Sequence, residues 1–198
     1  MRTAVLFDAD GVVIRSEPFT VALEKTYGIP ASRLNRFFRE DFPDCLVGKA
    51  ALTDRLDRLI SEIRWEGSRQ DLLDFWFRSE HRVDAELINQ LAALRKAGYL
   101  VALATNQEQN RARYLRNEMG LDAVFDRLFF SCELGAKKPD PEFYRKIQQM
   151  LQSDGVSKII FFDDHARNVE AAIHAGWQAM PYSSIQDFHT AKTSGLDF

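Results

Sequence analysis

The 198-residue chain has few cysteines and no long apolar run. Cys45 and Cys132 lie far apart, and neither has a cysteine or histidine neighbour at the spacing of a metal site. No apolar stretch approaches the roughly 18 residues that a membrane span needs, and the one before Asp8 is too short for a signal peptide. These absences predict a cytoplasmic protein with reduced thiols and no membrane segment.

The chain also lacks a strong charge of one sign. Its 26 basic and 29 acidic residues give a formal net charge of -3 and are mixed along the sequence without a polybasic run. This pattern argues against a nucleic acid or a membrane surface as a partner. Hydrophobic residues make up 45% of the chain, enough to fill the core of one domain that carries a modest insertion.

Short apolar runs alternate with helical patterns over most of the chain. The predicted strands cover 3–7, 99–104, 128–130, 158–162 and 178–182. The predicted helices cover 84–97, 108–119, 141–151 and 169–175. This alternation predicts the α/β class, with a doubly wound, Rossmann-like parallel sheet that has helices on both faces.

One segment shows only helical periodicity. In 15–83 the apolar residues recur at helical spacing, and turn residues interrupt them around 41–48 and at Gly67. We therefore expect a core domain of 1–14 and 84–198, and a small all-helical cap of 15–83. The aromatic stretches 37–38 and 75–77 are expected to fill the core of the cap more than to form a substrate platform.

Polar side chains follow the predicted strands. They are Asp8, Asp10, Thr105, Asn106, Lys138, Asp163 and Asp164. Because ligands bind at the carboxyl ends of strands in such sheets, these residues are expected on one rim. Clustered carboxylates repel unless a cation or a proton lies between them, and oxygen ligands without histidine or cysteine favour Mg²⁺.

Four of these segments, in this order, carry a family resemblance. They are 8–12 (Asp, Ala, Asp, Gly, Val), 105–106, 138–141 (Lys, Pro, Asp, Pro) and 161–164, the last followed by 168–172. The chain resembles the haloacid dehalogenase-like hydrolase superfamily, whose ordered motifs lie at the ends of four strands. The resemblance covers nearly all of the chain outside the cap.

The resemblance implies a role for each residue. Asp8 would be the nucleophile that forms an aspartyl phosphate, and Asp10 the general acid and base. Thr105 would contact the phosphoryl group, and Asn106 would either orient its loop or contact the phosphate. Lys138 would neutralise the charge of the phosphoryl group and restrain Asp8.

The same resemblance implies a Mg²⁺ site formed by Asp8, Asp10 through its backbone carbonyl, Asp164 and Asp163. Asp164 is the expected direct ligand and Asp163 its outer partner, although their roles could be exchanged.

Structural alternatives stay open for the same residues. Asp8 and Asp10 could serve only the geometry of a turn, while Thr105 with Asn106, and Asp163 with Asp164, could cap the helices that follow them. Lys138 could be a solvated lysine.

The expected function is a phosphatase for small phosphorylated metabolites, with sugar phosphates as the best candidate. Asp10 argues against dehalogenation, because the dehalogenases of this superfamily lack this acid and base. A phosphomutase or a catalytically silent binding module are the alternatives. In the cap, Lys49 in the turn 44–49 could reach the leaving group, or could simply begin an exposed helix.

Overall fold

The computed structural model describes residues 2–193; residues 1 and 194–198, which belong to the expected core domain, lie outside the described part. Five parallel strands form one sheet in the order β3-β2-β1-β4-β5. They are β1 (Arg2–Phe7), β2 (Leu100–Thr105), β3 (Arg127–Phe130), β4 (Val156–Asp163) and β5 (Gln178–Pro181). The predicted α/β class with a doubly wound parallel sheet is confirmed.

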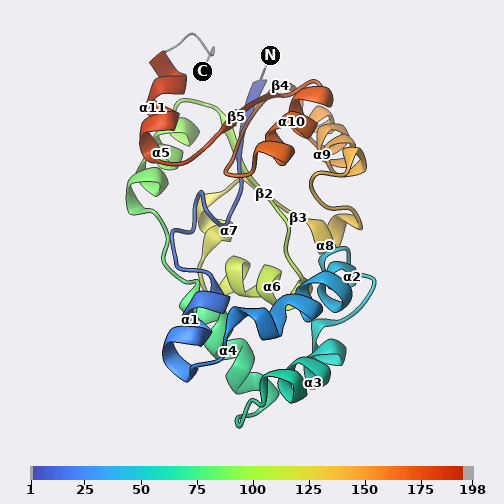
Figure 1. The fold of residues 1–198 in the computed structure, drawn as a ribbon. Helices are drawn as coiled ribbons and strands as arrows, with labels where there is room; N and C mark the ends of the chain where they lie inside the picture. Colours follow the sequence, from blue (N-terminus) through green and yellow to red (C-terminus); the bar gives the residue numbers. More distant parts are fainter. Residues whose placement is uncertain (1, 194–198) are drawn as a thin grey trace.

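Helices cover both faces of this sheet (Figure 1). One face carries α5 (Ala85–Lys96), α6 (Gln109–Asn117), α7 (Leu121–Val124) and α11 (Ile185–Thr193). The other face carries α9 (Pro141–Ser153) and α10 (Ala166–His174), and the short helix α8 (Ser131–Leu134) follows β3 directly. Two separate apolar clusters therefore sandwich the sheet.

The central strand β1 is buried on both faces of the sheet, as its apolar sequence requires. Val5 and Phe7 pack into one of the two clusters, while Ala4 and Leu6 pack into the other. All four are fully buried, because successive side chains of a strand point to opposite faces of the sheet. A continuous apolar run is what a strand buried on both faces requires.

The inserted segment is helical and has an apolar cluster of its own. Its elements are α1 (Phe19–Tyr27), the 3-10 helix η1 (Ala31–Leu34), the π-helical turn η2 (Phe37–Asp41), α2 (Phe42–Leu46), α3 (Leu52–Ile63) and α4 (Arg69–Ser79). They lie together beyond one end of the sheet, in the lower part of Figure 1. The buried members of the cluster all come from residues 19–77, and the aromatic stretches contribute Phe37, Trp76 and Phe77 to it.

The chain leaves and re-enters the sheet domain along two adjacent segments. Ile14 forms an antiparallel bridge with Val83. On either side of this bridge, the Arg15 amide donates to the Arg82 carbonyl at 2.8 Å and the Asp84 amide donates to the Val13 carbonyl at 2.8 Å. The two connections are thus tied to each other at the base of the helical segment.

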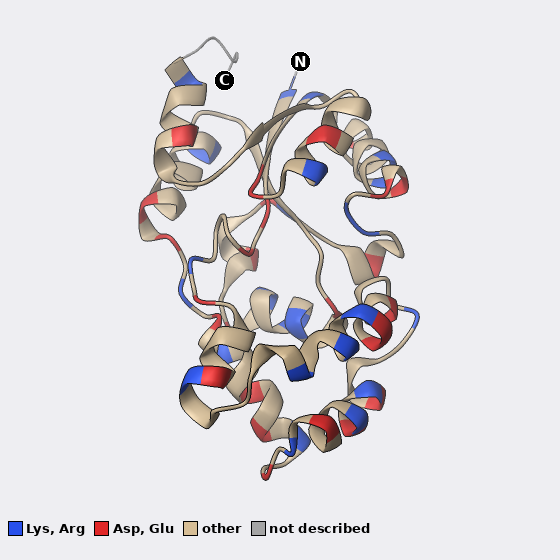
Figure 2. Ribbon diagram, in the orientation of Figure 1, with Lys and Arg blue, Asp and Glu red and all other residues tan. Residues whose placement is uncertain are grey.

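Charged residues of both signs are interspersed over the ribbon, as the sequence suggests (Figure 2). Within residues 2–193, no helix is both long enough and apolar enough to cross a membrane. Both cysteines are free thiols, and burial raises the pKa of each to about 11.

Candidate active site

The strand order brings three polar side chains to one point on the rim of the sheet. Because β1 lies between β2 and β4, the carboxyl ends of these strands are neighbours. Asp8 directly follows β1, Thr105 is the last residue of β2, and Asp163 is the last residue of β4. All three are buried, with exposed fractions of 7%, 1% and 0%.

Lys138 joins two of these residues in a buried ion-pair network. Its Nζ lies 2.8 Å from Asp8 Oδ1 and 2.6 Å from Asp163 Oδ2. The residue is only 3% exposed, so the alternative of a solvated lysine is wrong. Burial alone would lower the pKa of Lys138, but the attraction of the two carboxylates outweighs it and the net shift is upward.

Asp8 is held on one side of its carboxylate. Its Oδ1 accepts a hydrogen bond from the Ala9 amide at 2.7 Å in addition to the contact with Lys138. Burial raises the pKa of Asp8 to about 7, because the attraction of Lys138 only partly offsets burial and the repulsion of Asp163 adds to it. Asp8, Asp10, Asp163 and Asp164 all lie on this rim. Their combined negative charge exceeds the single positive charge of Lys138.

Asp163 is fully engaged by the protein itself. Besides Lys138, it accepts hydrogen bonds from the Asn168 side chain, at 2.9 Å to Oδ1 and 3.1 Å to Oδ2, and from the His165 amide at 2.8 Å. The N-cap residue of α10 is His165, which makes no side-chain cap hydrogen bond. The helix-cap alternative for the aspartate pair is therefore wrong.

Asp164 points to the turn that follows β1. A Cβ atom on Gly11 would lie 2.3 Å from Asp164 Oδ2, and Gly11 has a φ of +83°, so only glycine fits this turn. Asp164 Oδ1 lies 2.7 Å from His165 Nδ1. Ligand atoms of Asp163, Asp164 and His165 lie within 4.8 Å of one another, a spacing that could hold a metal ion.

Asn106 fastens the loop that carries Lys138. Its side chain donates to the Lys138 carbonyl at 3.0 Å and accepts from the Lys138 amide at 2.8 Å. The N-cap of α6 is Glu108, whose carboxylate accepts from two amides of the first turn, so the alternative of a cap by Thr105 or Asn106 is wrong. Asn106 thereby positions Lys138 from a distant segment of the chain.

Asp10 is held by residues that the sequence did not single out. Gln107 donates to Asp10 Oδ2 at 2.7 Å and to Thr105 Oγ1 at 3.2 Å. Arg111, in the first turn of α6, places Nη2 at 3.7 Å from Asp10 Oδ1. Gln107 and Arg111 both follow Thr105 within six positions. Their closeness to this motif is the only sequence feature that could have pointed to them.

Two cavities meet at Asp10. The carboxylate cavity is lined by Asp8, Asp10, Thr105, Asn106, Lys138, Pro139 and 165–168. The aromatic cavity lies between the sheet and the helical segment and is lined by Phe19, Phe38, Phe42, Trp76, Phe77, Glu80, Gln107, Glu108 and Arg111, together with Asp10, Pro18, Thr20 and Asn106. Asp10 and Asn106 are shared by both linings.

Lys49 is exposed and belongs to neither lining, and the Gly48 backbone packs close to the Cys132 carbonyl.

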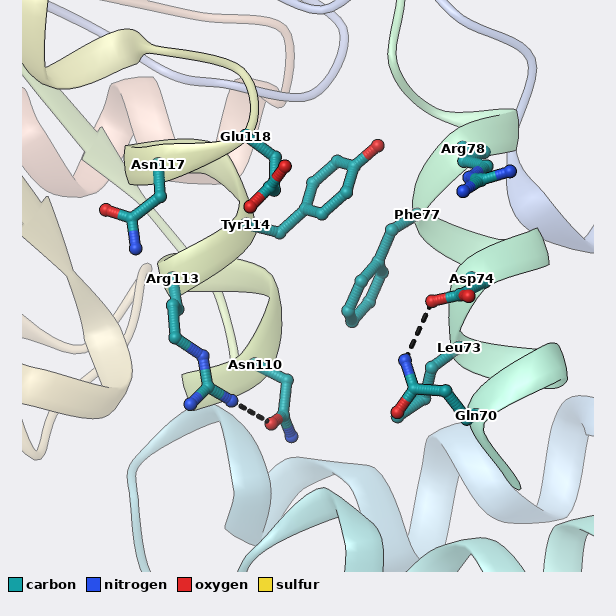
Figure 3. A pocket seen from close by; sticks show the side chains of 10 residues that line it. All are labelled: Gln70, Leu73, Asp74, Phe77, Arg78, Asn110, Arg113, Tyr114, Asn117 and Glu118. Carbon is teal, nitrogen blue, oxygen red and sulfur yellow. Dashed lines mark hydrogen bonds between the residues drawn. The ribbon is translucent and has the colours of Figure 1, made fainter. Parts of the chain in front are cut away.

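A third cavity lies between α4 and α6 (Figure 3), and its lining includes none of the four aspartates of the rim. Phe77 and Tyr114 face each other across it with ring centroids 5.3 Å apart. The Arg111 guanidinium lies 5.5 Å from the Phe77 centroid and 5.4 Å from that of Tyr114. It also donates to the carbonyls of Phe77 at 3.1 Å and Glu80 at 2.7 Å. Arg111 therefore joins the end of α4 to the rim of the sheet.

A doubly wound parallel sheet whose central strand ends in a buried, lysine-paired aspartate defines an α/β enzyme with a carboxylate-centred site. The chain belongs to the haloacid dehalogenase-like hydrolase family, whose model matches residues 3–176.

Curated relatives and a solved structure agree with this assignment. The chain is 28% identical over 196 residues to a phosphorylated carbohydrates phosphatase of Thermotoga maritima, covering 96% of this chain and 88% of that protein. It is 31% identical to a phosphatase of Mycobacterium tuberculosis, covering 89% and 85%. A haloacid dehalogenase-family enzyme of Bacteroides thetaiotaomicron, solved with magnesium and inorganic phosphate, shares the fold with a TM-score of 0.75 and 19% identity over 91% of this chain and 94% of that one. The predicted enzyme class, a phosphoric monoester hydrolase, is confirmed.

Proposed function

We propose that this protein is a Mg²⁺-dependent phosphatase for small phosphorylated metabolites that works through a phosphorylated Asp8. The observation that carries the proposal is the one-sided fixation of Asp8 beside Asp10. Lys138 and the Ala9 amide both contact Asp8 Oδ1, so we assign Oδ2 as the attacking oxygen. Asp10 lies where the two cavities meet, the place we assign to the leaving oxygen.

In the first proposed step, Asp8 Oδ2 attacks phosphorus and forms a new bond while the bond from phosphorus to the leaving oxygen breaks. Asp10 donates its proton to that oxygen, and the alcohol leaves through the aromatic cavity. Thr105 donates a hydrogen bond to the phosphoryl group, and Lys138 offsets its charge. Asn106 keeps Lys138 in place through the two hydrogen bonds to its backbone.

In the second proposed step, water hydrolyses the aspartyl phosphate. Asp10, now a carboxylate, takes a proton from the water molecule, whose oxygen attacks phosphorus. The bond from phosphorus to Asp8 breaks, so inorganic phosphate leaves and Asp8 is regenerated. Gln107 and Arg111 hold both carboxylate oxygens of Asp10, which keeps this group in position for both proton transfers.

The donor set of the rim suits Mg²⁺. Asp8, the Asp10 carbonyl and Asp164 are the proposed ligands, because oxygen donors are those that this ion prefers. Asp163 is the proposed outer partner, since its oxygens are already occupied by Lys138, Asn168 and the His165 amide. When bound, the ion would offset negative charge on the carboxylates and on the transferring phosphoryl group.

Residues 15–83 are the proposed cap over this site. Their helices supply the aromatic rings of the second cavity, and the paired connections at Ile14 and Val83 are the proposed hinge. A cap in this position leaves room for a small ester and excludes phosphoproteins. Sugar phosphates remain the first substrates to test, and the name of the Thermotoga maritima relative supports them.

Release of inorganic phosphate from a generic aryl phosphate tests the proposal. We expect release that depends on Mg²⁺ and stops in chelator. A binding module would release none in either condition. A phosphomutase would convert a sugar phosphate to its isomer faster than it releases phosphate, and this result would overturn the assignment as a phosphatase.

A further inference from the structure

The aromatic cavity has a charge pattern that bears on the leaving group, and the inference from it rests on the proposed function. We infer that this cavity selects phosphate monoesters whose leaving group carries no negative charge of its own. Neutral alcohols such as sugars fit, whereas leaving groups with a carboxylate or a second phosphate do not.

The position of the cavity assigns it to the leaving group. Asp10 and Asn106 line both cavities, so an ester with its phosphoryl group beside Asp8 would extend past Asp10 into the aromatic cavity. The volume is about 210 Å³, below the about 300 Å³ at which pockets for drug-sized ligands begin. The cavity therefore suits a small leaving group.

The charges of this cavity are mainly negative. Its lining holds the carboxyl groups of Asp10, Glu80 and Glu108, and Arg111 is the single basic residue among them. Glu108 is committed to α6, because it accepts hydrogen bonds from the Asn110 and Arg111 amides. Glu80 is also hydrogen-bonded, by the Phe19 amide at 2.7 Å to Oε1 and by the Trp76 indole at 3.2 Å to Oε2, but its negative charge stays in the wall of the cavity.

The charge of Arg111 is already balanced. Its Nη2 lies 3.7 Å from Asp10 Oδ1 and 3.8 Å from Glu80 Oε2, and both Nη atoms donate to carbonyls at the end of α4. A second anion in the cavity would thus lie near the carboxylates of Glu80 and Glu108 without a free cation to offset it. Like charges at such distances repel even where the effective dielectric constant is about 20.

The remaining features of the cavity suit a neutral occupant. Phe19 and Trp76 stack with ring centroids 4.6 Å apart and provide an apolar wall.

Two matched pairs of esters test this inference with the full chain and Mg²⁺. The pairs are glucose 6-phosphate against 6-phosphogluconate, and 2-hydroxyethyl phosphate against phosphoglycolate, assayed at pH 8, above the pKa of about 7 that burial gives Glu80. We expect kcat/KM to favour the neutral ester by at least about tenfold in each pair. Equal or reversed values would overturn the inference while leaving the phosphatase intact. Failure of every ester to release phosphate would instead overturn the proposed function.

A variant pair locates the source of the selection. Glu80→Gln removes one negative charge from the cavity, so the ratio of kcat/KM for neutral over anionic esters should fall about threefold to tenfold. The control is Asp74→Asn, which removes a charge from α4, the helix that Glu80 follows, but on the wall of the α4–α6 cavity, and it should keep the wild-type ratio. Thermal melts would verify that both variants fold. An unchanged ratio in Glu80→Gln would overturn the role of this carboxylate.

Discussion

The carboxylate cavity and the aromatic cavity share Asp10 but are built in different ways. In the first, Asp8, Thr105 and Asp163 lie at or directly after strand ends, and a buried lysine ties two of them together. In the second, the walls are mainly aromatic side chains from residues 19–77, and the acidic groups of Glu80 and Glu108 lie at helix ends. The sheet fixes the groups proposed for chemistry, whereas packing between the helical segment and the sheet shapes the cavity proposed for the leaving group.

This difference implies different responses to mutation. Changes in the carboxylate cavity should affect every substrate, because they act on the phosphoryl group that all substrates share. Changes in the aromatic cavity should affect substrates unequally, because only the leaving group enters it. The four predictions below run from the largest expected effect to the smallest. The first three concern turnover or its Mg²⁺ requirement, and the last concerns stability.

Asp8→Asn should lower kcat by at least about 10⁴-fold for every ester, because the amide keeps the shape but lacks a nucleophilic oxygen anion. Steady-state phosphate release measures this loss, and circular dichroism would verify the fold. Turnover near that of the wild type would exclude Asp8 as the nucleophile.

Asp10→Asn should slow turnover by about 10²- to 10⁴-fold, since the amide cannot transfer the proton. The loss should be smaller for an aryl phosphate with an acidic leaving group than for a sugar phosphate, because a good leaving group needs less protonation. Equal rates in mutant and wild type would leave Asp10 with only a structural role.

Asp164→Ala should raise the Mg²⁺ concentration needed for half-maximal activity by about 10- to 100-fold, and by more than Asp163→Ala does. The reason is that Asp163 is already occupied by protein donors, whereas Asp164 faces the turn at Gly11. A Mg²⁺ titration of both variants decides the order. The reverse order would exchange the two roles.

Glu80→Gln should change how stability depends on pH. Burial, assisted by the charge of Asp10, raises the pKa of Glu80 from 4.5 to about 7. The folded protein therefore keeps a proton that the unfolded chain releases, and this contribution to stability, complete below pH 4.5, is lost as the pH rises through 7. Between pH 5 and pH 8 the wild type should lose about 2 kcal/mol more than the variant. Urea unfolding without Mg²⁺ measures this, and equal losses would contradict it.

The parts of the molecule that the sequence predicted well depend on local patterns. The run before Asp8 is apolar on both faces, which indicates a buried parallel strand, and the alternation after residue 84 indicates the doubly wound sheet. Residues directly after such strands meet at one rim, so Asp8, Thr105 and Asp163 could be expected together. Their chemical roles remain predictions that the experiments above test.

The residues that the sequence missed act through tertiary contacts. Arg111 looks like an ordinary surface residue of an amphipathic helix, yet it is buried between α4 and the rim because α4 packs against α6. Glu80 follows α4 and lies near Asp10 and Arg111 only in the folded chain. No local sequence pattern predicts such contacts. The aromatic stretches by themselves likewise indicate only that they fill the core of the expected cap.

Phosphorylation of Asp8 during turnover is the most direct test of this account. The wild-type enzyme with Mg²⁺ would be mixed with an excess of a phosphate-labelled aryl ester, quenched in acid within one turnover, and mapped by peptide mass spectrometry. The account predicts an acid-stable, hydroxylamine-sensitive phosphoryl group on Asp8, present in the wild type and absent in Asp8→Asn. Active turnover with the phosphoryl group on another residue would contradict the central claim.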